Sequence, residues 1–246
     1  MTEYVRATTD IKIGDHPEWH LFGLTLNADT IISTLIASAI LVILGFVVRA
    51  KVTSGPPGGI QLFFETVTRT LREQIETTVG VRVAPYLVPL SVSLFCFILI
   101  ANWLSVLPLT INGKELLPAP AGDVNLVFAL ALMVFVWKHV VGARRHHGFG
   151  RQIVHTLKGH DPRFAPMWVI EEVSGVLSHS LRLFGNILAG GIMLQVIASL
   201  LPVFISPVLN GGWKLFDLFI GAVQAFIFAF LTIIYFSQAM ELREDH

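Results

Sequence analysis

The sequence contains little charge and almost no cysteine. Charged residues make up 14% of its 246 residues and the formal net charge is zero, whereas an average globular domain has about 25% charged residues. A chain without excess positive charge is not expected to bind nucleic acid. The single cysteine, Cys96, excludes an intramolecular disulfide and a zinc site built from cysteines. The N-terminus lacks a basic segment followed by an apolar core, so we expect no cleavable signal peptide.

Long apolar segments take the place of charge. Hydrophobic residues make up 54% of the chain, and several windows reach the roughly 20 residues that a membrane-spanning helix needs. We therefore predict an all-α integral membrane protein forming one membrane domain, with three ordinary spans and two long, strongly tilted helices. The expected segments are an external arm (1–27), spans at 28–50, 84–109 and 124–142, an amphipathic helix (60–80), a cytoplasmic loop (143–166) and long helices at 167–201 and 213–242.

Positive charge sets the expected orientation. Arg49 and Lys51 end the first span, and the 143–166 loop is the densest basic stretch. Because Lys and Arg favour the cytoplasmic side, we place the N-terminus outside and the C-terminus inside. Lys138 is expected to snorkel to the interface. The loop histidines match no strong zinc pattern, so we expect no metal there.

Three further segments carry structural signals. Helix 60–80 has apolar residues at helical spacing with charges between them, which is typical of an amphipathic helix. It suits the cytoplasmic membrane surface, a partner helix or its own protein equally well. Asn102 and Trp103 suit an interfacial position at the outer end of the second span. We expect Pro202, Pro207 and Asn210-Gly211-Gly212 to separate the two long helices.

Arg182 is the residue that most needs an explanation. No Asp, Glu, Lys or Arg occurs from Leu183 to Trp213. An arginine at the centre of a membrane helix costs roughly 2.5–3.5 kcal/mol on insertion scales, and it does not deprotonate. This charge therefore needs an anionic partner or a place on an ion path, and the acids of its own helix lie about 15 Å away along the axis.

Polar residues follow one side of each long helix. At about 100° per residue, Glu171, Ser178 and Asn186 share the face of Arg182, while Glu172 and His179 lie on its flank. On the last helix Gln224 returns close to the azimuth of Asp217. A row of small residues, Gly221-Ala225-Ala229, favours close helix contact, so we expect the two long helices to pack as an antiparallel pair.

This arrangement is suited to moving protons. Carboxylates near the cytoplasmic end (Glu171, Glu172) and near the external end (Asp217) can bind and release protons. A fixed guanidinium between them cannot relay a proton. It can instead block leakage and attract a carboxylate from a neighbour. The residues thus predict two offset half-channels separated by one positive charge.

The motifs around these residues are similar to those of one family. The segment Leu181-Arg182-Leu183-Phe184-Gly185-Asn186, followed by Ala189-Gly190, resembles the signature of subunit a of F-type ATP synthases. The tail from Gly221 to Phe228 resembles the final-helix motif of that family, and Pro166 with Glu171-Glu172 resembles the segment that leads into its arginine helix. The resemblance covers roughly residues 84–242.

The resemblance implies a partner and roles for individual residues. Subunit a faces a rotating ring of c subunits in the bacterial plasma membrane, together with peripheral-stalk b-type subunits and the rest of the synthase. The essential arginine maps onto Arg182, the amides onto Asn186 and Gln224, and the inner-channel acids onto Glu171 and Glu172, with Ser178 and His179 beside them. The chain itself would be non-catalytic and would bind no cofactor and no nucleotide, since it has no phosphate-binding glycine loop.

One position departs from the family pattern. Many bacterial relatives have Glu directly after the Ala-Gly pair, and this sequence has Gly191 there. Our hypothesis is that Asp217 supplies the outer-channel carboxylate instead, brought close to Gly191 by antiparallel packing.

Other functions remain open from the sequence. A sodium-translocating version of the same subunit differs mainly in the carboxylate site of the ring. A secondary transporter would show broken helices in matching halves, and the halves here differ. A membrane hydrolase would need a nucleophile beside a base, and Ser178 and His179 point in different directions on a helix. A scaffold leaves Arg182 unexplained.

Overall fold

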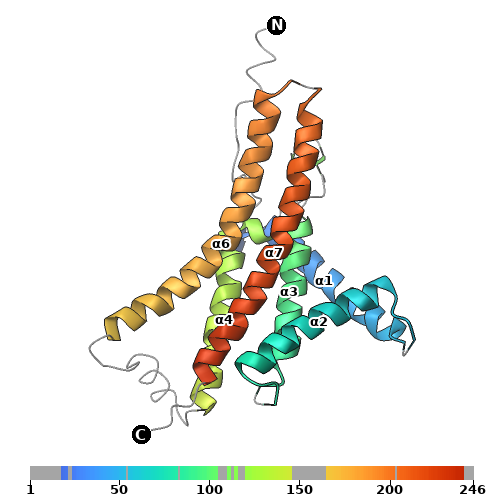
Figure 1. Cartoon of the computed structure of the whole chain (residues 1–246). Coiled ribbons are helices and arrows are strands. Elements are labelled where there is room, and N and C mark those ends of the chain that lie inside the picture. Colours follow the sequence, from blue (N-terminus) through green and yellow to red (C-terminus); the bar gives the residue numbers. More distant parts are fainter. Residues whose placement is uncertain are drawn as a thin grey trace.

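The chain folds into a bundle of long helices. The computed structural model describes residues 18–21, 24–53, 55–82, 84–104, 110–111, 114–115, 120–145, 165–202 and 204–240. The helices there are α1 (Ala28–Lys51), α2 (Gly59–Thr78), α3 (Leu87–Leu104), α4 (Val124–Arg145), α6 (Ala165–Leu200) and α7 (Ser206–Met240) (Figure 1). Within these residues, all but α2 are long and apolar enough to cross a membrane, which confirms the predicted integral membrane protein.

Two short hairpins and a 3-10 turn lie before α1 and between α3 and α4. Strand β1 (Glu18–Leu21) pairs antiparallel with β2 (Leu24–Asn27), and β3 (Thr110–Ile111) pairs antiparallel with β4 (Lys114–Glu115). A 3-10 turn, η2 (Pro120–Gly122), precedes α4. We did not predict these hairpins. They lie outside the candidate spans, so the membrane part remains all-helical.

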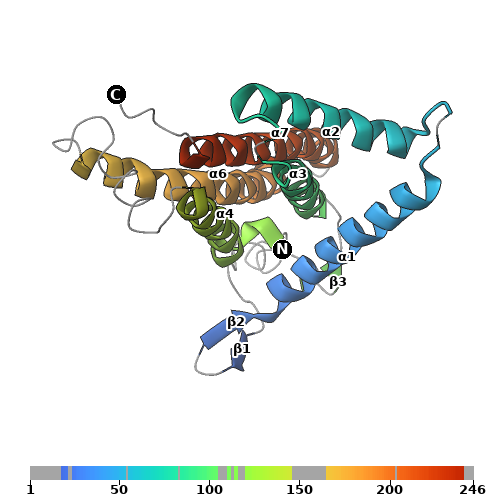
Figure 2. The same ribbon diagram turned by 90° about the horizontal axis from the view of Figure 1, so that it is seen from below.

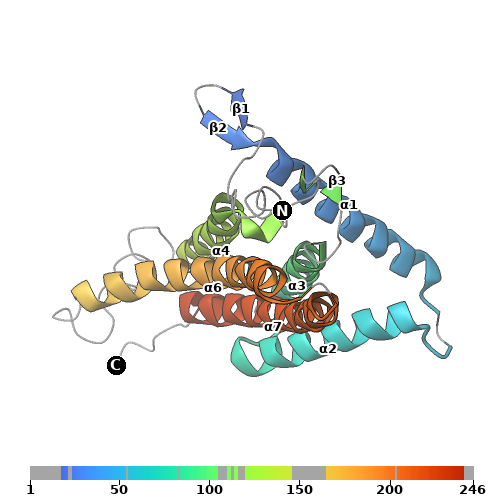
Figure 3. The same ribbon diagram turned by 90° about the horizontal axis from the view of Figure 1, so that it is seen from above.

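Helices α6 and α7 are the longest elements and lie side by side. At 1.5 Å per residue, their 36 and 35 residues reach about 50 Å, well beyond a hydrocarbon core of about 30 Å. The first part of α6 leans away from the bundle, and its second part runs alongside α7 (Figure 1). Viewed along the bundle, α7 lies between α6 and α2 (Figures 2 and 3).

The start of α7 corrects one expectation. We expected the last helix to begin at Trp213, after the breaker residues, but it begins at Ser206. Pro207 is compatible with a first helical turn, where a backbone N–H has no helical partner anyway. Gly211 and Gly212 lie inside the helix and are exposed, because in lipid the backbone gains more from its internal hydrogen bonds than glycine costs.

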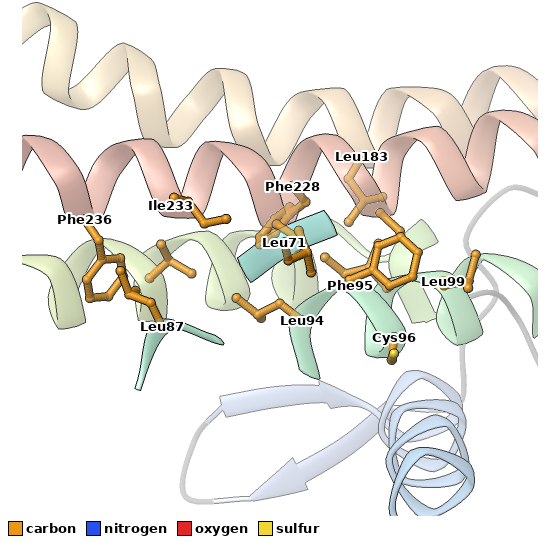
Figure 4. Close-up of a cluster of buried hydrophobic side chains, with 14 of the residues drawn as sticks. Leu71, Leu87, Leu94, Phe95, Cys96, Leu99, Leu183, Phe228, Ile233 and Phe236 are labelled. Atoms are coloured by element: carbon orange, nitrogen blue, oxygen red, sulfur yellow. The ribbon is translucent and has the colours of Figure 1, made fainter. Parts of the chain in front are cut away.

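The buried core joins α3 and α7 with α2. Its fully buried side chains come from all three helices, and Leu183 adds a contact from α6 (Figure 4). The small-residue row of α7 contributes to this packing, since Gly221, Ala225 and Ala229 are buried. Gly221 lies against α3, where a Cβ would be 3.0 Å from the Asn102 Cβ. This contact therefore holds α7 against α3, whereas we expected it to face α6.

The amphipathic helix α2 packs on its own protein. Leu71 and Ile75 on its apolar side are buried in the core, and the Ser237 hydroxyl of α7 donates a hydrogen bond to the Thr78 carbonyl at 3.2 Å. The helix ends at Thr78, and Gly80, two residues later, has a φ of 86°, in the left-handed region that favours glycine after a helix. The sequence left open whether this helix packs on the membrane surface, on a partner helix or on its own protein. Packing on its own protein is thus confirmed.

Side-chain hydrogen bonds join the helix ends at one side of the bundle. Asp123 precedes α4 and accepts hydrogen bonds from the Asn27 amide at 2.7 Å and the Thr30 hydroxyl at 2.8 Å, both at the start of α1. The same carboxylate caps α4 by accepting the Asn125 backbone N–H at 2.8 Å. The first turns of α1 and α4 therefore lie at the same level of the bundle.

Candidate functional site

The interface between α6 and α7 places polar residues at several levels. Residue numbers rise on α6 as those of the contacting residues fall on α7, which confirms the predicted antiparallel pair. The contacts that define this register are Gly175 with the Tyr235 hydroxyl, the His179 ring with the Phe228 ring, and Gly190 with the Asp217 carboxylate.

The middle level contains Arg182 and Gln224. The two side chains line one small cavity of about 10 Å³ together with His179, Leu183, Ile227 and Phe228. A space of this size has room for about one water molecule if polar groups surround it. Arg182 and Gln224, which lie on different helices, thus line the same cavity in the structure.

Arg182 lines this cavity and is also accessible at the surface of the chain. Arg182 is exposed, and the ion pairs between described residues involve other cations: Arg69, Lys138 and His139. No described carboxylate therefore neutralises Arg182. A permanent cation within a membrane helix usually pairs with another polar group or faces a water-filled cavity.

His179 lies one turn before Arg182 and is buried, with 4% of its surface exposed. Its ring centroid lies 3.8 Å from that of Phe228 and 5.9 Å from that of Tyr235. Its Nε2 atom is buried and has no hydrogen-bond partner among the described residues. The sequence placed His179 on the flank of the Arg182 face, and the structure shows that this flank faces α7.

The level of Asp217 lies beyond Arg182, toward the link between the two helices. A Cβ on Gly190 would be 2.7 Å from the Asp217 Oδ1 atom and 2.9 Å from Cγ. The carboxylate therefore occupies the space that the missing side chain leaves. Gly191, the next residue, is exposed and has open space around it, so Asp217 lies directly against Gly190 and next to Gly191 in the sequence.

Two residues of α3 support α7 near Asp217. The Asn102 amide donates a hydrogen bond to the Gly221 carbonyl at 3.1 Å, and the Trp103 indole donates one to the Leu218 carbonyl at 3.2 Å. Asn102 is buried, with 5% of its surface exposed. Its amide therefore finds a partner on the backbone of α7, and the interfacial depth expected for Asn102 stays a prediction.

The opposite level contains a cluster of ionisable side chains. The Lys138 ammonium forms an ion pair with the Glu172 carboxylate. The His139 Nε2 atom lies 3.4 Å from the same oxygen of Glu172. The ammonium also lies 5.0 Å from the ring centroid of Tyr235. Residues of α4, α6 and α7 thus meet around one carboxylate.

This cluster corrects the expectation for Lys138. We expected its side chain to extend to the interface, but only 8% of the side chain is exposed. Charges inside a membrane domain usually pair with each other, and a lone lysine in an apolar helix is the signal that could have predicted a partner. His139 and Tyr235 were not predicted as site residues, because helical periodicity gives the direction of a side chain but not the helix that it contacts.

The remaining predicted site residues are Ser178, Asn186 and Glu171. Ser178 is exposed and Asn186 is half-buried. Glu171 belongs to α6, but its side chain lies outside the described residues, as do the loop histidines at 146–160. Within the residues that the structure describes, no group of three or more metal-ligating side chains occurs.

Comparisons with known proteins point to one family. The sequence model described as "ATP synthase A chain" matches residues 31–237. The chain is 52% identical to the ATP synthase subunit a of Mycobacterium bovis and to that of Mycobacterium tuberculosis, in both cases over the full length of both chains. It is 42% identical to the ATP synthase subunit a of Acidothermus cellulolyticus, over 94% of this chain and 83% of that protein.

Proposed function

Because the chain belongs to the ATP synthase A chain family, the subunit a of bacterial F-type ATP synthases, we propose that it is the stationary proton channel of the membrane sector, Fo. It is a multi-pass protein of the bacterial plasma membrane. In this proposal it faces the ring of c subunits and is held by peripheral-stalk b-type subunits. It binds no nucleotide, and ATP is formed elsewhere in the complex.

The observation that carries the proposal is the state of Arg182. Its cation is exposed on α6 without a carboxylate partner among the described residues. A resident carboxylate would make this arginine a structural ion pair. A cation at the surface with no carboxylate partner among the described side chains instead suits a succession of mobile anions, such as the one membrane carboxylate that each c subunit presents.

The ionisable groups on either side of Arg182 suit two half-channels. Glu172 is ten residues before Arg182 and Gly190, beside Asp217, is eight residues after it. These separations correspond to about 15 Å and about 12 Å along the helix axis. In the proposal, protons enter from outside past Asp217, are carried by the ring, and leave past the Glu172 level to the inside.

The guanidinium keeps the two half-channels apart. Arginine remains charged at any physiological pH, so it does not pass a proton from one half-channel to the other. Its positive charge favours the ionised form of a nearby ring carboxylate. A c subunit that reaches Arg182 is therefore expected to lose its proton to the inner half-channel and then to accept another from the outer one.

The test is Arg182→Ala in the assembled ATP synthase. We expect the variant complex to assemble and to lose proton-driven ATP synthesis in inverted membrane vesicles, because nothing then separates the half-channels or attracts the ring carboxylate. Co-purification of the c ring and of the soluble ATPase sector measures assembly. Gln195→Ala, which changes an exposed polar residue of the same helix, should keep wild-type synthesis.

Two outcomes decide against the proposal. Normal proton-driven ATP synthesis by the Arg182→Ala variant would show that the Arg182 charge is not needed for coupling. Loss of assembly with no effect on coupling in the complexes that do form would indicate a scaffold. Repeating the wild-type assay without sodium distinguishes the ions, since a proton channel keeps its rate and the sodium-translocating alternative loses it.

A further inference from the structure

The cluster around Glu172 contains a histidine with a defined tautomer. The His139 Nδ1 atom lies 2.9 Å from the Phe135 carbonyl of the preceding turn. A carbonyl can only accept a hydrogen bond, so Nδ1 carries the hydrogen. In the neutral ring Nε2 then has a free lone pair, and this atom faces the Glu172 carboxylate.

When the ring is neutral, the Nε2 lone pair therefore faces a carboxylate oxygen at a partly buried place. The side chains of His139 and Glu172 are 14% and 21% exposed, and Nε2 lies 3.4 Å from the carboxylate oxygen. A single proton between these atoms converts a contact of two lone pairs into a charge-assisted hydrogen bond, which is roughly twice as strong as a neutral one. The His139 Nε2 atom and the Glu172 oxygen are thus placed so that they can share one proton.

Lys138 limits how firmly that proton is held. Its ammonium pairs with the same carboxylate oxygen and lies over the rings of Phe135 and Tyr235, 5.4 and 5.0 Å from their centroids. With neutral His139, the lysine and the glutamate balance to zero net charge. A bound proton leaves the cluster with one excess positive charge, which is unfavourable in a low-dielectric environment.

We propose that His139 and Glu172 form a proton-binding site at the inner end of the channel, with Lys138 as the fixed charge that makes it release the proton. A proton delivered by water forms an N–H bond at Nε2, and the Glu172 oxygen accepts the hydrogen bond. Transfer to a water on the inner side breaks that N–H bond and restores the neutral ring. This inference rests on the proposed function and adds two residues of α4 to the path.

Other ionisable groups face this site from the packed helices. Tyr235 of α7 approaches from one side and lies between the Lys138 ammonium and the His179 ring. His179, on the same helix as Glu172, lines the Arg182 cavity. Polar groups thus continue from the Arg182 level to His139.

The experiment uses inverted vesicles containing the complete ATP synthase, in which the inner side faces the bath. ATP synthesis is measured against bath pH at constant lumenal pH, with the proton-motive force held constant by a potassium diffusion potential. His139→Gln keeps a polar side chain but removes the basic nitrogen. We expect a loss of rate and a loss of the wild-type response to bath pH, while the response to lumenal pH is unchanged.

Lys138→Met provides an independent measurement. Without the ammonium the site should hold its proton more firmly, so the response to bath pH should shift to higher pH. In the double variant with His139→Gln this shift should disappear, which a purely structural role of Lys138 does not predict. Trp137→Phe alters an exposed neighbour on the same helix and should keep the wild-type profile.

The outcomes separate this inference from the function on which it rests. A wild-type response to bath pH in His139→Gln, or a shift that persists in the double variant, overturns the proton-binding site. If Arg182→Ala still abolishes coupled synthesis in that case, the channel function stands and only the role of His139 fails. If Arg182→Ala keeps coupled synthesis, the proposed function itself fails.

Discussion

At the scale of single residues, the absence of a side chain at Gly190 leaves the space that the Asp217 carboxylate occupies. Gly190→Ala would place a methyl group 2.7 Å from the Oδ1 atom, so the carboxylate at the end of the Asp217 side chain must move away from this position. We expect a loss of coupled ATP synthesis, as in Asp217→Asn. Gly191→Ala, with open space around it, is the matched control. Equal activity of the two alanine variants, measured in vesicles, would argue against a role for the Asp217 position.

At the scale of elements, Asp123 joins α1 to α4. Burial alone would raise the pKa of this carboxyl, but hydrogen bonds from Asn27, Thr30 and Asn125 outweigh it and lower the pKa below 3.8. A carboxyl whose pKa is lower in the folded state than in the unfolded state stabilises the folded protein at pH values above its unfolded-state pKa. This contribution is lost as the pH falls through its folded-state pKa. Asp123→Asn should therefore unfold at a lower temperature than wild type at pH 7.

The pH dependence distinguishes this effect from a packing defect. In thermal unfolding of the detergent-purified chain, the difference in unfolding temperature between Asp123→Asn and wild type should narrow as the pH falls from 3.8 through the lower pKa of the folded wild-type carboxyl, since that carboxyl then also becomes neutral. If the difference in unfolding temperature stayed constant over this pH range, the lower stability of Asp123→Asn would come from altered packing and not from the lost charge.

The helices also show which features a sequence can predict. Apolar length predicted the five spans, and periodicity placed Arg182 and His179 on adjoining faces of α6. Periodicity could not show that Gly221 meets α3, or that Lys138 meets Glu172, because it gives an azimuth and no neighbour. Pro207 suggested a break, although it stands in the first turn of α7. The sequence therefore predicted which residues of each helix belong to the candidate site, but only some of the contacts between the helices.

At the scale of the whole molecule, the proposed direction of proton flow depends on the orientation of the bundle. Both ends of α4 are suitable for testing it, since Val124 and Arg144 are exposed and lie at opposite ends of the helix. Their separation of twenty residues corresponds to about 30 Å, the thickness of the hydrocarbon core. Because Cys96 is the only cysteine and is buried, Cys96→Ser gives a background without thiols.

In that background, a membrane-impermeant maleimide should label Val124→Cys in intact cells and Arg144→Cys only in inverted vesicles. The physical reason is the cost of moving basic side chains across the membrane, which keeps the Arg144 end inside. The reverse pattern would place the Asp217 level inside and the Glu172 level outside, because α6 begins on the side where α4 ends: Lys138 and Glu172 pair near these two ends. The roles of the two half-channels would then have to be exchanged, while the separation by Arg182 would remain.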